Sequence, residues 1–423
     1  MMSLLAGNTA ARIGAMGSLL AGTAMVAQAG GPDLVGEFTL FRVLPGILCV
    51  LAVCGLPGAS PYFLARQDDL ARIRAALVWI TLGGAVLGAL VWLALSPVVK
   101  YVFLDQLSLA VVAAAAIPTF TQTFVAVGKS QLQGALDQRG ANVAIVLEEL
   151  AFLPLYGAVL FFSPDLFSQN VTGMLAGLVL ADVSVAAGIA VRLARQGYFR
   201  GWRVPGLRLI REICGYGLRG QVGGLMQLLN DRFDVAFVAA VASPTVFGVY
   251  SVASKVADVL RMPGLALTYV LYPTFARDPR NAAAKTASLM LKALGISVLV
   301  AVPVVLLARP LLPLLLGPAF AAAVVPAQIM IGGTVVCSVA GLVTAFLLGI
   351  GRPGANSLSI VAGVVMTVTL NWLLVPPLGA VGAAIAAAAA NVATTFTLLA
   401  FFLRLRGTLP PSPGESTPQK VSA

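Results

Sequence analysis

The segment Val35-Gly36-Glu37-Phe38 returns later in the chain as Phe247-Gly248-Val249-Tyr250, at a shift of 212 residues. The match ends with Phe63-Leu64-Ala65-Arg66 in the first copy and Phe275-Ala276-Arg277 in the second. A further pair of matching positions, at shifts of 213 to 215, consists of Gly134, Arg139 and Gly140-Ala141-Asn142 against Gly349, Arg352 and Gly354-Ala355-Asn356. Matches at nearly one offset predict two structural repeats. In membrane transporters built this way, the substrate path lies at the repeat interface.

The composition is that of an integral membrane protein. Hydrophobic residues make up 59% of the 423 residues, charged residues only 10%, and the mean hydropathy is +0.96. A typical globular domain carries about a quarter charged residues. The strands of a β-barrel would alternate apolar and polar residues, whereas this chain has continuous apolar runs of roughly 20 residues. We therefore predict an all-α integral membrane protein with about 12 transmembrane helices in two pseudo-symmetric six-helix lobes.

Twelve runs are long enough to cross a bilayer as helices. They are 13–30, 38–64, 75–98, 106–128, 141–163, 171–192, 220–243, 247–272, 287–309, 322–349, 357–376 and 380–403. This pattern predicts an N-terminal lobe over 1–192, a basic cytoplasmic linker over 193–219, a C-terminal lobe over 220–403 and a disordered cytoplasmic tail over 404–423. The first run also resembles a signal peptide, but removing it would break the repeat, so we expect it to remain as a span.

Lysine and arginine fall mainly in alternate loops. With a cytoplasmic N-terminus, 21 of the 27 basic residues lie in cytoplasmic segments. The positive-inside rule then predicts a multi-pass membrane protein with both termini in the cytoplasm. This distribution also explains most of the net charge of +11 without nucleic-acid binding. Within the linker, 207–214 alternates apolar and basic residues at helical spacing, which predicts an amphipathic helix at the lipid surface; partner binding is the alternative.

Several kinds of chemistry are excluded by the residues that the sequence lacks. The chain contains no histidine, and its four cysteines form no CxxC motif. Imidazole catalysis and Cys/His metal sites are therefore excluded, and the cysteines are expected to be small buried side chains. No P-loop is present. We predict no enzymatic activity and no cofactor or metal; active transport would draw on an ion gradient or on the substrate's own gradient.

Basic residues within or beside the spans are candidate ligands for an anionic substrate, because charges inside a membrane are costly. The four candidates are Arg42, Arg232, Lys255 and Arg261. Lys255, Asp258 and Arg261 are spaced by three and share a helix face. The repeat offset brings Arg42 near Lys255, so cations would face one another across the pseudo-symmetry axis, as a phosphate site requires. The alternative is that Asp258 simply neutralises one of its neighbours.

Acidic residues in the spans are candidates for ion coupling. They are Asp231, Asp234, Glu148, Glu149 and Asp182. Asp231 and Asp234 share a face and could bind a proton or a cation, whereas an internal ion pair with Arg232 is the structural alternative. Glu148, Glu149 and Asp182 could carry a proton, or could be held by hydrogen bonds to a neighbouring helix.

Four segments resemble a known family when their order and spacing are taken together. They are Gly248-Val249-Tyr250-Ser251-Val252-Ala253-Ser254-Lys255, then Leu315-Leu316-Gly317-Pro318-Ala319-Phe320, then Leu348-Gly349-Ile350-Gly351-Arg352-Pro353, and finally Asn371-Trp372-Leu373-Leu374-Val375-Pro376. The chain is similar to the polysaccharide biosynthesis flippases of the multidrug/oligosaccharidyl-lipid/polysaccharide (MOP) exporter superfamily, which move lipid-linked oligosaccharides. The resemblance implies a MATE-like fold with a central cavity, and pyrophosphate binding by the four basic residues.

The resemblance also implies a location in the bacterial cytoplasmic (inner) membrane, a substrate and partners. The substrate would be an undecaprenyl-pyrophosphate oligosaccharide for exopolysaccharide, capsule or O-antigen synthesis, flipped by alternating access. Partners would be membrane lipids, a glycan polymerase and glycosyltransferases. The alternatives are a MATE-type drug/cation antiporter, a flippase for the peptidoglycan precursor lipid, and a non-transporting membrane scaffold for glycan enzymes.

Overall fold

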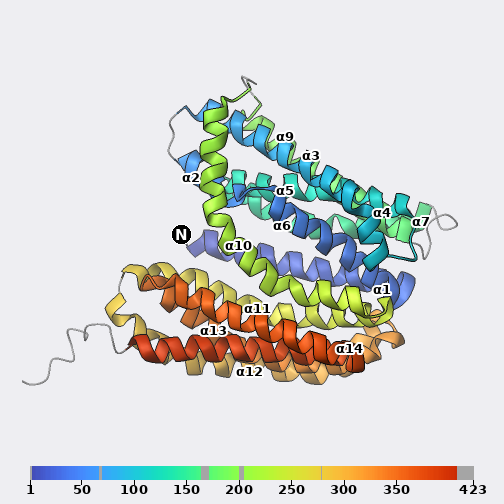
Figure 1. The fold of residues 1–423 in the computed structure, drawn as a ribbon, viewed down its shortest axis with the longest axis vertical. Helices are drawn as coiled ribbons and strands as arrows, with labels where there is room; N and C mark the ends of the chain where they lie inside the picture. The colour runs from blue at the N-terminus through green and yellow to red at the C-terminus, as the bar shows by residue number, and fades with distance from the viewer. Residues whose placement is uncertain (1, 66–68, 163–170, 200–203, 278, 407–423) are drawn as a thin grey trace, which may run out of the picture. The chain divides into compact units, whose positions relative to one another are not determined.

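The computed structural model describes all residues except 1, 66–68, 163–170, 200–203, 278 and 407–423. The described part of the chain is helical, without strands (Figure 1). A bilayer offers no water to the backbone, so each spanning segment must satisfy its N–H and C=O groups internally, as an α-helix does. The predicted all-α membrane fold is confirmed, and the predicted tail lies mostly outside the described residues.

The helices follow one another with short connections (Figure 1). In chain order they are α1 (Met2–Ala52), α2 (Leu56–Ala65), α3 (Leu70–Phe103), α4 (Leu109–Ala114), α5 (Ala116–Gly134), α6 (Gln138–Leu150), α7 (Phe152–Phe162), α9 (Val171–Arg195), α10 (Leu207–Val241), α11 (Pro244–Arg277), α12 (Pro279–Leu316), the 3₁₀ turn η1 (Pro318–Ala323), α13 (Val324–Gly349) and α14 (Pro353–Arg406).

Eight helical segments of the described chain are long and apolar enough to cross a membrane. Helix α14 contains two predicted spans, and α1 contains one predicted span and most of a second. Gly31 (φ 68°) interrupts α1 and Gly379 (φ 54°) interrupts α14. Only glycine adopts such backbone angles readily, so a helix bends there without a loop. The total of twelve spans stays a prediction.

Three predicted boundaries are wrong. The run at 38–64 is broken at 53–55, where Cys54 (φ 48°) and Gly55 (φ 71°) adopt left-handed angles between α1 and α2. The run at 141–163 is divided at Ala151 into α6 and α7. The helix predicted at 207–214 exists, but it continues without interruption into the next span as α10. Apolar composition located these segments, whereas the backbone angles that divide or join them leave little trace in hydropathy.

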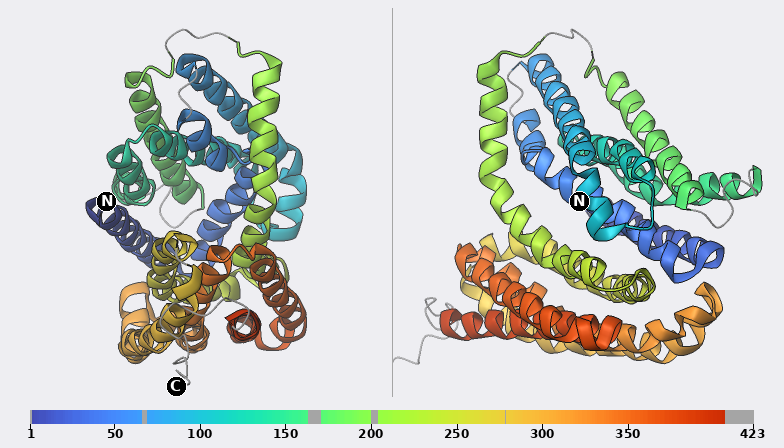
Figure 2. Two further views of the ribbon diagram at one scale, coloured as in Figure 1. Left: turned by 90° about the vertical axis from the view of Figure 1, so that its left-hand side faces the viewer. Right: turned by 45° about the vertical axis from the view of Figure 1, so that its right-hand side comes forward.

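The chain forms two compact units. The first comprises Met1–Leu228, Ser243–Ser251 and Leu315–Ala319, and the second comprises Leu229–Ala242, Val252–Leu314 and Phe320–Ala423. In the first unit, α5 packs against α1, α3, α6 and α9 (Figure 2). Its core includes Phe63, Leu77, Val127 and Ile189. In the second unit, α13 and α14 lie side by side around Phe346 and Phe402, whose ring centroids are 5.0 Å apart.

The repeated motif meets its own copy within the first unit. Asp33 and Thr245, which are 212 residues apart, form a hydrogen bond of 2.6 Å from the Thr245 hydroxyl. A Cβ atom at Gly36 would lie 3.0 Å from the carbonyl oxygen of Pro244, and one at Gly248 would overlap the carbonyl oxygen of Pro32. The contact is therefore reciprocal between corresponding positions of α1 and α11. Glycine lets the two backbones approach this closely, as is common between membrane helices.

We expect Gly248→Ala to destabilise the protein by about 1–3 kcal/mol, the usual cost of overpacking. The new methyl group would meet backbone atoms of Pro32, which cannot rotate away. The measurement is thermal unfolding of the purified protein in detergent. Gly332→Ala is the matched control, because a Cβ atom at Gly332 of α13 meets nothing within 4 Å. Equal midpoints for the two variants would show that the close contact is absent.

Candidate functional site

Arg42 of α1 forms an ion pair with Glu149 of α6. Its Nη2 atom donates to both carboxylate oxygens, each at 2.6 Å. The side chains are 21% and 17% exposed, so the pair is shielded without being sealed. The guanidinium carbon also lies 5.4 Å from the ring centroid of Phe38, one turn earlier on α1, within the range of a cation–π contact. Both partners belong to membrane-spanning segments.

Glu148, the neighbour of Glu149, forms a second ion pair, with Lys129 of α5. Adjacent residues on a helix point about 100° apart, so the two glutamates reach different helices. The chain reverses at 135–137, so α5 and α6 lie beside each other. Lys129 lies about two helical turns before this reversal and Glu148 about three helical turns after it, and their side chains meet between the two helices. The two pairs together fasten α6 to both α1 and α5.

Asp182 of α9 is the most buried acid of the group, at 7% exposed. It accepts a hydrogen bond of 3.4 Å from the Nε2 atom of Gln122 on α5. Arg42 lies close enough to interact electrostatically with its carboxylate. We call Arg42, Lys129, Glu148, Glu149 and Asp182 the charge network. It joins α1, α5, α6 and α9 and holds three acidic and two basic residues.

The sequence identified four of these five residues. For Glu148, Glu149 and Asp182, the expected hydrogen bonds to a neighbouring helix are confirmed. Lys129 is not among the candidates that the sequence offers, because the predicted span 106–128 ends one residue before it and leaves it in the following loop. Helix α5 instead runs on to Gly134 and keeps Lys129 half-buried. The antiparallel pairing of α5 and α6 about their turn was the signal that could have located it.

The remaining candidates lie on α10 and α11. Arg261 donates to Asp258 at 3.4 Å, which is the contact that the alternative interpretation of this helix face expects; anion binding by Lys255 and Arg261 stays a prediction. Lys255 and Asp234 are half-buried, and Arg232 is exposed. The side chain of Asp231 lies outside the described part. The facing of Arg42 and Lys255 across a pseudo-symmetry axis stays a prediction.

The four cysteines are less buried than expected. Only Cys49 is fully buried, whereas Cys54, Cys214 and Cys337 are half-buried. Among the described residues, no group of three or more metal-ligating side chains comes together. The charge network places basic and acidic side chains in direct contact, and such an arrangement can bind charged groups.

Long apolar helices that carry paired charges define a multi-pass membrane protein, and solved structures show which fold it has. The chain is similar to an inward-facing MATE multidrug resistance transporter of the MOP superfamily (TM-score 0.73, 16% identity, 93% of this chain and 94% of that chain). It is also similar to the lipid II flippase MurJ in an inward closed conformation (TM-score 0.73, 10% identity, 96% and 90%). A third relative is a MOP superfamily transporter from Pyrococcus furiosus, described as having a binding pocket of reverse polarity (TM-score 0.65, 16% identity, 97% and 96%).

The fold is therefore that of the MOP superfamily, as the sequence resemblance predicted. Residues 47–325, more than half of the chain, match the family of polysaccharide biosynthesis proteins. The chain belongs to that family. No curated protein matches it by sequence.

We expect Glu149→Gln to cost about 1–3 kcal/mol of stability, because it leaves the Arg42 charge without its carboxylate among apolar helices. The double variant Arg42→Gln with Glu149→Gln should recover part of that loss. A double-mutant cycle read by thermal unfolding gives the coupling energy directly. Glu212→Gln, at an exposed position of α10, is the control. Strictly additive effects of the two single changes would contradict the pairing.

Proposed function

We propose that this protein flips a lipid-linked oligosaccharide, carried on undecaprenyl pyrophosphate, across the bacterial inner membrane by alternating access. Membership of the polysaccharide biosynthesis family supports the substrate class. The observation that carries the proposal is the Arg42–Glu149 pair. The pair holds the Arg42 guanidinium between membrane-spanning helices, where a substrate phosphate could replace the Glu149 carboxylate as its partner.

Arginine suits this exchange chemically. Its planar guanidinium binds carboxylate and phosphate in the same forked geometry, and a pyrophosphate brings more negative charge than one carboxylate. At 21% exposure, the Arg42 side chain is not completely enclosed by the helices. A pyrophosphate on Arg42 would leave Glu149 without its cation, and a proton taken up by Glu149 would remove the resulting charge. Substrate binding would thereby be linked to a proton and to the packing of α1 on α6.

Further parts of the proposal rest on the sequence. Arg232, Lys255 and Arg261 would be additional pyrophosphate ligands, and Asp231, Asp234 and Asp182 additional sites of ion coupling. Transport would draw its energy from an ion gradient or from the substrate's own gradient. Both termini would lie in the cytoplasm, where glycosyltransferases supply the substrate, and a glycan polymerase would take the product on the other side. The protein itself would catalyse no chemical reaction.

One observation favours a second candidate, a drug/cation antiporter. The charge network contains one more acidic than basic residue, and an organic cation could bind where Arg42 now pairs with Glu149. The fold is compatible with both candidates, since a MATE transporter and MurJ match it equally well by TM-score.

A reconstituted assay separates the two candidates. Proteoliposomes would carry an undecaprenyl-pyrophosphate oligosaccharide, and a soluble lectin would report the glycan that reaches the outer leaflet. We expect transfer by the wild type and a loss of more than about tenfold in Arg42→Gln, because an ionic contact to phosphate is worth about 1.5–3 kcal/mol. Arg404→Gln, an exposed arginine in the last turn of α14, should transfer normally.

The same vesicles would be tested with a fluorescent organic cation under a proton gradient. Movement of the cation without movement of the glycan lipid would contradict the flippase proposal and support the antiporter. Movement of neither substrate, in protein that unfolds cooperatively, would leave the membrane scaffold as the better account.

A further inference from the structure

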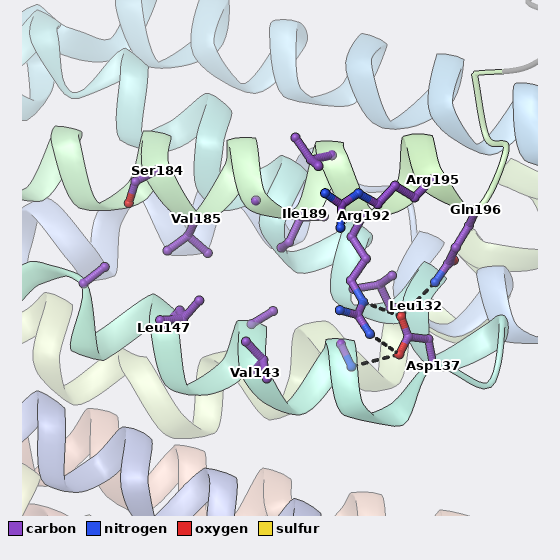
Figure 3. A pocket seen from close by; sticks show the side chains of 15 residues that line it. Leu132, Asp137, Val143, Leu147, Ser184, Val185, Ile189, Arg192, Arg195 and Gln196 are labelled. Atoms are coloured by element: carbon purple, nitrogen blue, oxygen red, sulfur yellow. Dashed lines mark hydrogen bonds and ion pairs between the residues drawn. The ribbon is translucent and has the colours of Figure 1, made fainter.

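A groove of about 440 Å³ runs between α6 and α9 on the first unit (Figure 3). None of its lining residues belongs to the charge network. One end is polar and is formed by Asp137, Arg192, Arg195 and Gln196. The rest is lined almost wholly by apolar side chains of the two helices, among them Val143, Leu147, Val185 and Ile189 (Figure 3).

The polar end is built around Asp137, which caps the N-terminus of α6. Its carboxylate accepts from Gly140 N at 2.9 Å, from Arg192 Nε at 2.5 Å and Nη2 at 2.8 Å, and from Gln196 Nε2 at 2.8 Å. The hydrogen bond from Arg192 is the main reason that the pKa of Asp137 lies below its ordinary value. Arg192 therefore balances Asp137, and Arg195 gives this end of the groove a net positive charge.

Arg192 and Arg195 are three residues apart in the last turn of α9, on one face of the helix. Both guanidinium groups lie at the same end of the groove (Figure 3). The end of a membrane-spanning helix lies at the level of lipid headgroups, and arginine side chains there reach the interface. A phosphate at that level would meet the positive end of the groove.

The apolar part of the groove is open along its side. Val143 is 54% exposed, Leu147 41% and Val191 51%, although all three belong to spans. A Cβ atom at Gly188, which also lines the groove, would meet nothing within 4 Å. An open, apolar groove along two membrane-spanning helices has the shape and chemistry to hold a lipid acyl chain.

We infer that the groove between α6 and α9 is a binding site for one anionic phospholipid. The acyl chain lies along Val143, Leu147 and Gly188, and the phosphate meets Arg195 and Arg192. Charge decides between lipid classes, because a basic residue near the interface attracts an anionic lipid by about 1 kcal/mol, whereas a zwitterionic headgroup brings its own cation. The site is independent of the proposed transport function.

Native mass spectrometry of the full-length protein in detergent tests this assignment, with phosphatidylglycerol and phosphatidylcholine of equal chain length as probes. We expect one phosphatidylglycerol to be retained in preference to phosphatidylcholine. Arg195→Gln should lower this preference roughly fivefold, the factor that corresponds to about 1 kcal/mol. Gly188→Phe, at a position where a Cβ atom would meet nothing within 4 Å, should reduce retention of phosphatidylglycerol by filling the groove.

Two matched variants serve as controls. Arg404→Gln removes an exposed last-turn arginine of α14, and Gly83→Phe adds the same ring at an exposed glycine of α3 whose Cβ would also meet nothing within 4 Å. Both should retain the lipid as the wild type does. Glycerol phosphate, the headgroup without acyl chains, should not displace the lipid. The inference is overturned by equal retention of the two lipids, by displacement with glycerol phosphate, or by equal effects of the groove and control variants.

Discussion

An ionised side chain within a membrane must have a partner of opposite charge, and this constraint organises the first unit of the protein. A charge without a partner costs several kcal/mol in an apolar setting. Arg42 and Lys129 therefore hold the helices that carry Glu149 and Glu148 beside their own. Because the partners come from α1, α5 and α6, the two ion pairs depend on how these helices pack against one another. Any rearrangement that separates the helices must supply replacement partners, such as a substrate phosphate or a proton.

A second constraint is steric. Corresponding positions of the two repeats meet where Gly36 and Gly248 allow α1 and α11 to approach backbone to backbone. The hydrogen bond between Asp33 and Thr245 joins another pair of corresponding positions. Duplication thus explains a contact that neither copy would need alone. The most evident repeat in the sequence coincides with the place where larger residues could not be accommodated.

Much of the fold could be predicted because a bilayer demands long apolar helices, and these appear directly in composition. Gly31 and Gly379 lie in the gaps 31–37 and 377–379 that the sequence leaves between predicted spans, but hydropathy does not show that the helix bends there without a loop. The break at Gly55 lies inside the predicted run 38–64 and could not be placed, since an interrupted helix and a continuous one have the same hydropathy. Glu148, Glu149 and Arg42 were identifiable as costly charges, but the sequence did not show which residue pairs with which. The pairing of Lys129 with Glu148 depends on where α5 ends, and a span limit six residues too early put Lys129 in a loop. The groove at Arg195 depends on the packing of two helices and has no sequence signal.

The central claim is that Glu149 occupies the place on Arg42 that an anionic headgroup takes during transport. The most direct test is the equilibrium affinity of the purified protein for undecaprenyl pyrophosphate, measured for the wild type, Glu149→Gln and Arg42→Gln. Removing the competing carboxylate should tighten binding by several-fold, whereas removing the guanidinium should weaken it. Unchanged affinity in both variants, with both proteins folded, would contradict the account.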